Sequence, residues 1–243
     1  MRDELIDQME RVQRGHFWFR ARAAILLRLL RPWLGPGARV LDAGCGTGLL
    51  LSRLPEGLCL AGLDISPRAL EHARGRLPVA DLREGALPGP LPFAPASQDL
   101  ILLTDVLEHV EDDVAALAAL RSLLAPGGRL VLTVPALPSL WTRHDEEHGH
   151  FRRYTRAGLS GRLAAAGLKT ERITFYNALL LPLVLASRWA RRLLGKDGDD
   201  MEIPAAPFNS LLYHLFALER HWLPWAGFPA GVSLLAVARR PAA

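Results

Sequence analysis

The chain has 243 residues, half of them hydrophobic and 22% charged, and a formal net charge of +4. This composition indicates one folded α/β domain with additional elements and excludes a wholly disordered chain. The excess of basic residues, almost all arginine, permits an acidic partner such as nucleic acid or anionic lipid but does not require one. The two cysteines, Cys45 and Cys59, form no CxxC pair, so we expect neither a disulfide framework nor a zinc site built on thiolates.

The N-terminal stretch is charged and is predicted to be helical rather than a signal peptide. The longest apolar run, residues 178–186, contains a proline and falls short of the ~20 residues that a membrane-spanning helix needs. We therefore expect a cytoplasmic protein, with peripheral membrane contact through residues 177–225 as an open alternative.

Helical segments and strands are predicted to alternate from residue 39 onward. An amphipathic helical stretch to about residue 33, broken at Gly15 and His16, precedes them. The expected strands are 39–43, 57–64, 79–82, 98–105, 129–135, 168–176 and 232–240, and the expected helices of the core are 48–54, 66–77, 113–128 and 155–167. Ser66 is the expected N-cap of the second of these helices, with Pro67 in its first turn. Such alternation predicts parallel pairing with right-handed crossovers.

After residue 177 the pattern changes to two leucine-rich and aromatic helices, 178–194 and 207–222, around a polar joint. The predicted fold is a doubly wound, Rossmann-like α/β fold with seven strands, mostly parallel, and an antiparallel last strand. Its expected parts are an N-terminal helical cover (1–36), a core (37–176), a helical lid or insertion (177–230) and the final strand (231–243).

The segment VLDAGCGTGLL, residues 40–50, ends the first strand in a glycine-rich turn. Parallel sheets bind ligands beyond the carboxyl ends of their strands. Gly44 and Gly46 fit the dinucleotide pattern G-x-G-x-x-G, but Leu49 stands at the third glycine position. Asp42 beside the turn would repel a diphosphate, so a ligand with an ammonium group fits better.

Asp64 ends the second strand, where a carboxylate can accept both hydroxyl groups of a ribose. The sequence thus indicates a ligand with a ribose and an amino-acid-like end but no diphosphate. S-adenosylmethionine has this shape.

Four motifs follow in order: VLDAGCGTG, LAGLDIS, LPFAPASQDLILLTDVLEHVEDD and LAPGGRLVLTVP. Over about residues 39–176 they resemble class I S-adenosylmethionine-dependent methyltransferases, and DVLEHV is most similar to the branch that includes ubiquinone-biosynthesis methyltransferases. The resemblance implies S-adenosyl-L-methionine as cofactor and methyl transfer to a small-molecule or lipid-like acceptor, with oxygen as the favoured atom. A non-catalytic S-adenosylmethionine-binding regulator and an NAD-dependent oxidoreductase remain as alternatives.

The resemblance also implies roles for residues of the turn and the second strand. Asp42 holds the cofactor's amino group, directly or through water, and Gly44 and Gly46 let the backbone approach its methionine portion. Asp64 binds the ribose hydroxyls, and Ile65 packs on the adenine.

The remaining cofactor contacts are expected from three other segments. Asp105 and Val106 line the methionine side near the transferable methyl group. Ala86 or Leu87 stands where family members usually carry an acid for the adenine amino group. Arg22, on the helix before the first strand, either meets the methionine carboxylate or extends its charged end to solvent from a packed aromatic helix.

Residues 140–155, LWTRHDEEHGHFRRYT, form the densest polar cluster of the chain. We predict that His144 or His148 is the catalytic base and that Asp145 orients it. Arg152 and Arg153 would then grip an anionic part of the acceptor. The alternative is a solvated loop whose arginines pair with the adjacent acids.

A metal ion is not expected, although Asp105, Glu108 and His109 form a D-x-x-E-H pattern to which a loop histidine could add a ligand. The favoured interpretation gives Glu108 and His109 structural roles. The sequence TDVLEH replaces the Asn/Asp-Pro-Pro-aromatic stretch of amino-methylating branches, so we expect no nucleic acid partner.

Overall fold

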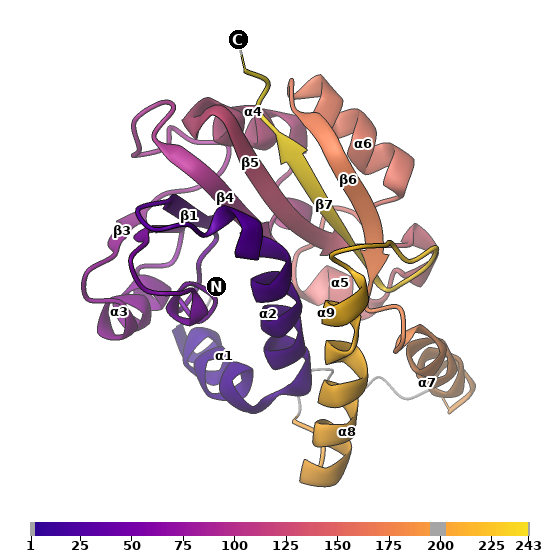
Figure 1. Ribbon diagram of the computed structural model, residues 1–243. Helices are drawn as coiled ribbons and strands as arrows, with labels where there is room; N and C mark the ends of the chain where they lie inside the picture. The colour runs from indigo at the N-terminus through magenta and orange to yellow at the C-terminus, as the bar shows by residue number, and fades with distance from the viewer. Residues whose placement is uncertain (1–2, 195–202, 243) are drawn as a thin grey trace.

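The structure, a computed structural model, describes residues 3–194 and 203–242. A seven-stranded sheet with the order β3-β2-β1-β4-β5-β7-β6 forms its centre (Figure 1). The strands are β1 (Arg39–Ala43), β2 (Cys59–Asp64), β3 (Asp81–Glu84), β4 (Gln98–Thr104), β5 (Leu124–Pro135), β6 (Lys169–Tyr176) and β7 (Ser233–Arg239). Only β7 runs antiparallel to its neighbours, β5 and β6. The predicted fold is confirmed.

Helices cover both faces of this sheet. The α-helices are α1 (Asp3–Gly15), α2 (Phe17–Leu30), α3 (Pro67–Arg76), α4 (Asp113–Leu123), α5 (Arg143–Glu147), α6 (Arg156–Ala165), α7 (Leu181–Leu194), α8 (Ala206–Ala217) and α9 (Glu219–Trp222). Four single turns of 3-10 helix are η1 (Arg31–Trp33), η2 (Leu51–Arg53), η3 (Leu107–His109) and η4 (Pro138–Leu140).

Alternating side chains of the strands separate two apolar cores. In β4, Leu100 and Leu102 pack with α2, α3 and α8, whereas Ile101 and Leu103 pack with α4 and α6 on the opposite face. All four side chains are fully buried. Because both faces are covered, β4 is apolar throughout, as a central parallel strand must be.

The start of α3 follows its predicted chemistry. Ser66 accepts a hydrogen bond from the backbone N–H of Ala69 at 3.2 Å, and Pro67 occupies the first helical position, where its missing N–H costs nothing. This cap sets the direction of the chain immediately after Asp64.

The prediction of a helix at residues 48–54 is wrong. The structure has turns there and a single 3-10 turn, η2. Pro55 follows at once, and the residue before a proline is disfavoured in helical conformation, so too few residues remain for an α-helix.

In the order of the chain, helices α7, α8 and α9 come after β6 and before β7. Helix α8 runs beside α2 (Figure 1). Glu219, at the start of α9, ties this insertion to the end of β6. Its carboxylate accepts hydrogen bonds from the backbone N–H groups of Asn177, Ala178 and Leu179 at 2.8, 2.7 and 2.9 Å. Along residues 3–194 and 203–242, no helix has both the length and the apolar character that crossing a membrane requires.

Candidate functional site

The glycine turn follows β1 at the point where strand order reverses, since β2 lies on one side of β1 and β4 on the other. The backbone N–H groups of Gly44 and Cys45 both donate to the carbonyl of Leu63, at 2.7 and 3.0 Å. Gly44 has φ +83°, and a Cβ there would lie 2.3 Å from Cγ2 of Val106. The turn therefore needs glycine at this position, because the side chain of Val106, which follows β4, packs against it.

Asp42 is 2% exposed, at the carboxyl end of β1. Its Oδ1 atom is buried and has no hydrogen-bond partner among the described residues. Burial raises the pKa of this carboxyl to about 7, Arg22 opposes the shift, and Asp64 adds to it. A buried carboxylate oxygen without a donor is costly, and a donor or a cationic group beside Oδ1 would remove that cost.

Asp64 is held by main-chain donors. Its Oδ2 accepts from the N–H of Gly46 at 2.7 Å, and its Oδ1 accepts from the N–H of Ser66 at 2.9 Å. Burial raises the pKa of Asp64, and these hydrogen bonds oppose the rise. Each oxygen keeps a lone pair for a further donor. The next side chain, Ile65, is 70% exposed and offers an apolar surface beside the carboxylate.

Arg22 reaches the same region from α2. Its guanidinium forms an ion pair with Asp105 and lies 4.4 Å from the ring centroid of Trp18. Asp105 has φ +54°, an uncommon backbone conformation for an aspartate, directly after β4. The structure thus brings Arg22 and Asp105 together near Asp42.

The segment expected near the adenine lies after β3. Ala86 is exposed, and Leu87 is half-buried against the core that contains α4 and α6. Glu84 pairs in register with Asp64 across β2 and β3 and is exposed. Glu84 is therefore the acid that lies beside Asp64 in the strand register.

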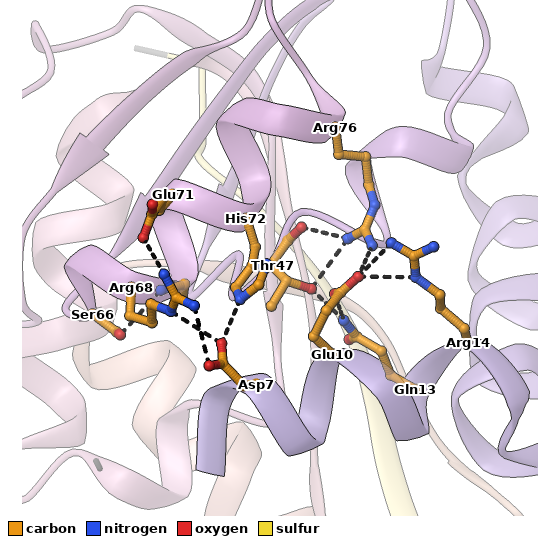
Figure 2. A network of polar contacts seen from close by, with 11 residues as sticks. Asp7, Glu10, Gln13, Arg14, Thr47, Ser66, Arg68, Glu71, His72 and Arg76 are labelled. Carbon is orange, nitrogen blue, oxygen red and sulfur yellow. Dashed lines mark hydrogen bonds and ion pairs between the residues drawn. The ribbon is translucent and has the colours of Figure 1, made fainter. Parts of the chain in front are cut away.

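Helix α1 lies over the glycine turn through a polar network that the sequence did not reveal (Figure 2). Glu10 pairs with Arg76 of α3 at 2.5 Å and with Arg14 at 2.6 Å, and Gln13 donates to the hydroxyl of Thr47 in the turn. Burial alone would raise the pKa of Glu10. Hydrogen bonds from Thr47 and Arg14 and the positive charge of Arg76 outweigh burial and lower this pKa. We call these contacts the α1–α3 network.

The same network includes Asp7 of α1, which contacts two side chains of α3. The carboxylate of Asp7 contacts Arg68 at 3.0 Å and His72 at 2.7 Å, and the hydrogen bond from Arg68 lowers the pKa of Asp7 to about 2. Figure 2 shows the side chains of α1 pointing toward α3 along their shared length.

Asp145 lies in the short helix α5, in the segment after β5, and is completely buried. Its carboxylate contacts Nδ1 of His150 at 2.9 Å, accepts from Nε and Nη2 of Arg153 at 2.8 and 2.9 Å, and accepts from the N–H of Thr142 at 2.8 Å. Burial alone would raise the pKa of Asp145, but these donors outweigh burial and hold the pKa well below its usual range. His150, which the sequence did not favour as the base, contacts this carboxylate.

The arginines of this loop contact acids within the protein. Arg153 pairs with Asp145 at 2.8 Å, and Arg152 pairs with Asp113 at 2.8 Å. The structure thereby corrects the expectation that both arginines point at an acceptor and agrees with the alternative that they pair with acids. His148 is exposed, with its ring centroid 6.4 Å from that of His150, and the side chain of His144 lies outside the described residues.

A second cluster joins η3 to this loop. The ring centroids of His109 and His150 are 4.6 Å apart, edge to face, and Glu108 lies beside them with a buried, unpartnered Oε2. Burial, together with the charge of Asp105, raises the pKa of Glu108 well above its usual value, and burial lowers the pKa of His109. The sequence put Glu108 and His109 side by side and allowed a loop histidine to join them, but it did not single out His150, because its approach depends on the fold of the loop.

Comparison with known proteins agrees with this geometry. Residues 13–173 match the family described as "Methyltransferase domain". A Mycolicibacterium smegmatis protein named "Probable S-adenosylmethionine-dependent methyltransferase" is 30% identical over 159 residues, which is 64% of this chain and 61% of that protein. The ubiquinone biosynthesis O-methyltransferase of Xanthomonas campestris is 36% identical over 103 residues, covering 40% of this chain and 43% of that enzyme.

Among solved structures, phosphoethanolamine N-methyltransferase 2 of Haemonchus contortus, in complex with S-adenosyl-L-methionine, shares the fold. It has a TM-score of 0.67 and 16% identity and covers 99% of this chain and 57% of that one. The match to the first curated relative covers about three fifths of that protein's length. With a family match over residues 13–173, more than half of its length, the chain belongs to the class I S-adenosylmethionine-dependent methyltransferase family that its motifs indicated.

Proposed function

We propose that this chain binds S-adenosyl-L-methionine and transfers its methyl group to an oxygen atom of a small or lipid-like acceptor. The observation that carries the proposal is the buried Oδ1 of Asp42, which has no hydrogen-bond partner among the described residues at the carboxyl end of β1. The ammonium group of the cofactor's methionine portion would supply the missing donor and the missing positive charge.

The rest of the donor set fits the same cofactor. Asp64 keeps acceptor capacity for the two ribose hydroxyls, and the exposed Ile65 side chain would pack on the adenine. Arg22, which pairs with Asp105, would bind the methionine carboxylate. Gly44 and Gly46 would leave room for the backbone to approach the methionine portion.

The chemistry divides between cofactor and protein. When bound, S-adenosyl-L-methionine would supply a methyl group made electrophilic by its sulfonium sulfur, which would leave as the neutral thioether. Asp105 and Val106 would shape the space beside that methyl group, because they follow β4 directly and Val106 closes over Gly44.

An acceptor hydroxyl must also lose its proton. We propose that a histidine of the loop 141–150 takes it, with His148 as the first candidate and His144 as the second. His148 is exposed beside His150, and a neutral imidazole accepts a proton near physiological pH.

The acceptor class is proposed from the surface of the insertion. Thirteen large hydrophobic side chains are exposed in the described part of the chain, and ten of them lie between residues 179 and 225. These ten are Leu179, Leu183, Leu185, Trp189, Ile203, Phe208, Leu211, Leu218, Trp222 and Trp225. An interaction surface would account for this concentration of exposed apolar side chains in one segment. We propose that it contacts a lipid-like acceptor or the membrane surface that holds one.

Turnover tests the reaction. The full chain with isotopically labelled S-adenosyl-L-methionine should methylate hydroxylated aromatic and polyprenyl-linked acceptors, and H148A should lower kcat by ~100-fold or more with a changed pH profile. H221A is the matched control, since His221 is an exposed histidine on α9. Methylation confined to amines, or unchanged kcat in both H148A and H144A, would contradict the proposed acceptor atom or base.

Vesicle flotation tests the surface. The chain should float with vesicles that contain anionic lipid at low salt, and the double variant W222S/W225S should float less because it removes two exposed indoles. V79S is the control, because Val79 is 97% exposed but lies outside the insertion. Equal flotation of all three proteins would count against membrane contact through this segment.

A further inference from the structure

A pocket on the sheet face that α2 covers lies apart from the glycine turn. It has a volume of about 590 Å³ and opens between the end of α2, the edge strand β6 and the segment after α9. Strands β4, β5 and β7 separate β6 from β1, which carries the turn. We infer that this pocket, which we call the α2–β6 pocket, binds the phosphate of an anionic phospholipid headgroup.

Positive charge gathers on the lining of the α2–β6 pocket. Three arginines contribute to it from separate elements: Arg28 of α2, Arg31 of η1 and Arg172 of β6. Among the residues that the structure describes, no carboxylate forms an ion pair with any of the three. Unpaired charges of one sign around a hollow raise the local concentration of ions of the opposite sign. The pocket therefore favours an anion.

Glu171, an acid of the same lining, does not neutralise these arginines, because it already has two partners. Its carboxylate pairs with Arg129 of β5 at 2.8 Å and lies 3.4 Å from Arg239 of β7. This group of two guanidinium ions and one carboxylate has no negative charge to spare. An anionic ligand would meet no net repulsion from it.

Arg172 shows most clearly that the pocket is built for a charge. A β-bulge shifts the pairing of β6 with β7 between Thr170 and Arg172, so that Arg172 lies opposite Val237, a residue of the core under α2. The half-buried guanidinium donates to the carbonyl of Ala226, and burial lowers its pKa. A guanidinium has five N–H donors, so most of them remain for an anion.

Aromatic and apolar side chains form the rest of the lining. Trp33 of η1 and Trp225, after α9, lie on it together with Leu29 and Pro224. Trp225 is 82% exposed, and Trp222, one turn earlier, is 58% exposed. Indole rings favour the boundary between water and hydrocarbon, because the ring is apolar and its N–H group is polar. The α2–β6 pocket thus combines cations with aromatic side chains at its opening.

This combination favours a phospholipid over a small anion. A free phosphate would use the arginines but leave the exposed indoles in water. A phospholipid would use both, since its phosphate can accept paired hydrogen bonds from a guanidinium while Trp222 and Trp225 enter the bilayer surface beside it. This choice rests on the proposed function, in which the insertion contacts a lipid-like acceptor or a membrane.

A soluble short-chain lipid tests the pocket without a membrane. Dihexanoyl phosphatidylglycerol, kept below its micelle concentration, should bind the full chain with one lipid per chain by calorimetry. R172M and the double variant R28M/R31M should each weaken this binding by ~10-fold or more, because each removes charged donors to the phosphate. R11M, which removes an exposed arginine of α1 outside the pocket, should bind as the parent does. Circular dichroism verifies that each variant is folded.

Two further ligands identify the chemistry that is recognised. Dihexanoyl phosphatidylcholine should bind ~10-fold more weakly or less, because its choline cancels the charge of the phosphate. Inorganic phosphate should also bind more weakly than phosphatidylglycerol, because it lacks the apolar part. Inorganic phosphate that binds as tightly as the lipid would overturn the assignment to a phospholipid. Unchanged lipid affinity in folded R172M and R28M/R31M would overturn the pocket itself and leave Arg172 as an inward charge that protects the edge of the sheet.

Flotation with vesicles of phosphatidylcholine and phosphatidylglycerol separates this inference from the proposed function. R172M should float less than R11M, although both lose one positive charge. If the short-chain lipid binds but the chain does not float, the α2–β6 pocket stands and the proposed membrane contact fails. If R172M and R11M float as the parent does and the short-chain lipid does not bind, the membrane contact stands and the pocket fails alone. The turnover assay is run separately, so methyl transfer is judged independently of either result.

Discussion

The two sides of the candidate site are built differently. At the carboxyl ends of β1 and β2, main-chain groups hold the functional atoms: Asp64 accepts from the N–H groups of Gly46 and Ser66, and Gly44 donates to the carbonyl of Leu63. In the loop after β5, side chains hold one another, as Asp145 holds His150 and Arg153. The first arrangement depends mainly on backbone shape, the second on which side chains happen to meet.

This difference explains what each side can do. A backbone-defined turn presents the same donors and acceptors whatever lies around it, which suits a fixed cofactor. A network of side chains can be replaced residue by residue, which suits an acceptor that differs among relatives. Most of the exposed large apolar side chains of the described residues belong to the segment 179–225.

The largest expected effect is that of G44A, which tests how strongly the backbone-defined side depends on glycine at position 44. A methyl group there would lie 2.3 Å from Val106 at φ +83°, so we expect a loss of ~3 to 6 kcal/mol in the free energy of unfolding from strain and overpacking. Chemical denaturation measures it. G57A is the control, because Gly57 has φ +81° with nothing within 4 Å and should lose only the strain. Equal losses would show that the contact with Val106 does not matter.

The next largest effect concerns the charge of Asp42. Its pKa is about 7 in the folded protein and near 3.8 when unfolded, so the folded state binds the proton more tightly. The stability that this adds is present below about pH 4 and is lost as the pH rises to about 7, by at most ~4 kcal/mol. D42N should flatten this part of the profile of unfolding free energy against pH.

The same variant separates stability from function. The ionised carboxylate is the form that would bind an ammonium group, so the parent's affinity for S-adenosyl-L-methionine should rise from pH 6 to pH 8. D42N should lose ~10-fold or more in affinity and most of this pH dependence, measured by calorimetry. D42N that keeps the parent's affinity at pH 8 would contradict the assigned role.

E219A tests whether the insertion is held to the core by one side chain. Three backbone N–H groups, those of Asn177, Ala178 and Leu179, would lose their acceptor, and we expect ~3 kcal/mol of destabilisation. E219Q, which keeps one acceptor oxygen, should lose less. Thermal unfolding compares the two variants, and equal melting temperatures for E219A and the parent would refute the role.

The sequence predicted the backbone-defined side well, and the reason is physical. Gly44 and Ser66 act through local conformation and capping, which depend on neighbours in the chain. Alternation of helices and strands likewise predicted the sheet, because every strand except β3, with its single buried residue, carries its own apolar pattern. The helix expected at 48–54 failed through a local signal, Pro55, that the apolar pattern outweighed.

The side-chain networks could not be predicted in the same way. Glu10 meets Arg76 across 66 residues, and His150 reaches Asp145 only once its segment is folded. Charged residues are abundant in both segments, so composition alone allows many pairings. The sequence therefore indicated where polar chemistry gathers but not which groups pair.

The smallest expected effect tests whether the α1–α3 network supports the glycine turn. Glu10 and Arg76 are both largely buried, so a double-mutant cycle with E10Q and R76M should give a coupling energy of ~1 kcal/mol, more than an exposed pair gives. The exposed pair Arg83–Asp81 is the control and should give a coupling energy near zero.

The single variant E10Q tests the effect on the cofactor site. In E10Q, amide hydrogen exchange of α1 should become faster. The affinity for S-adenosyl-L-methionine should fall by less than ~10-fold, because the turn keeps its main-chain bonds to Leu63 when α1 loosens. A loss as large as that of D42N would mean that α1 contributes to the cofactor site directly, and the division between a backbone-defined side and a side-chain-defined side would have to be redrawn to include it.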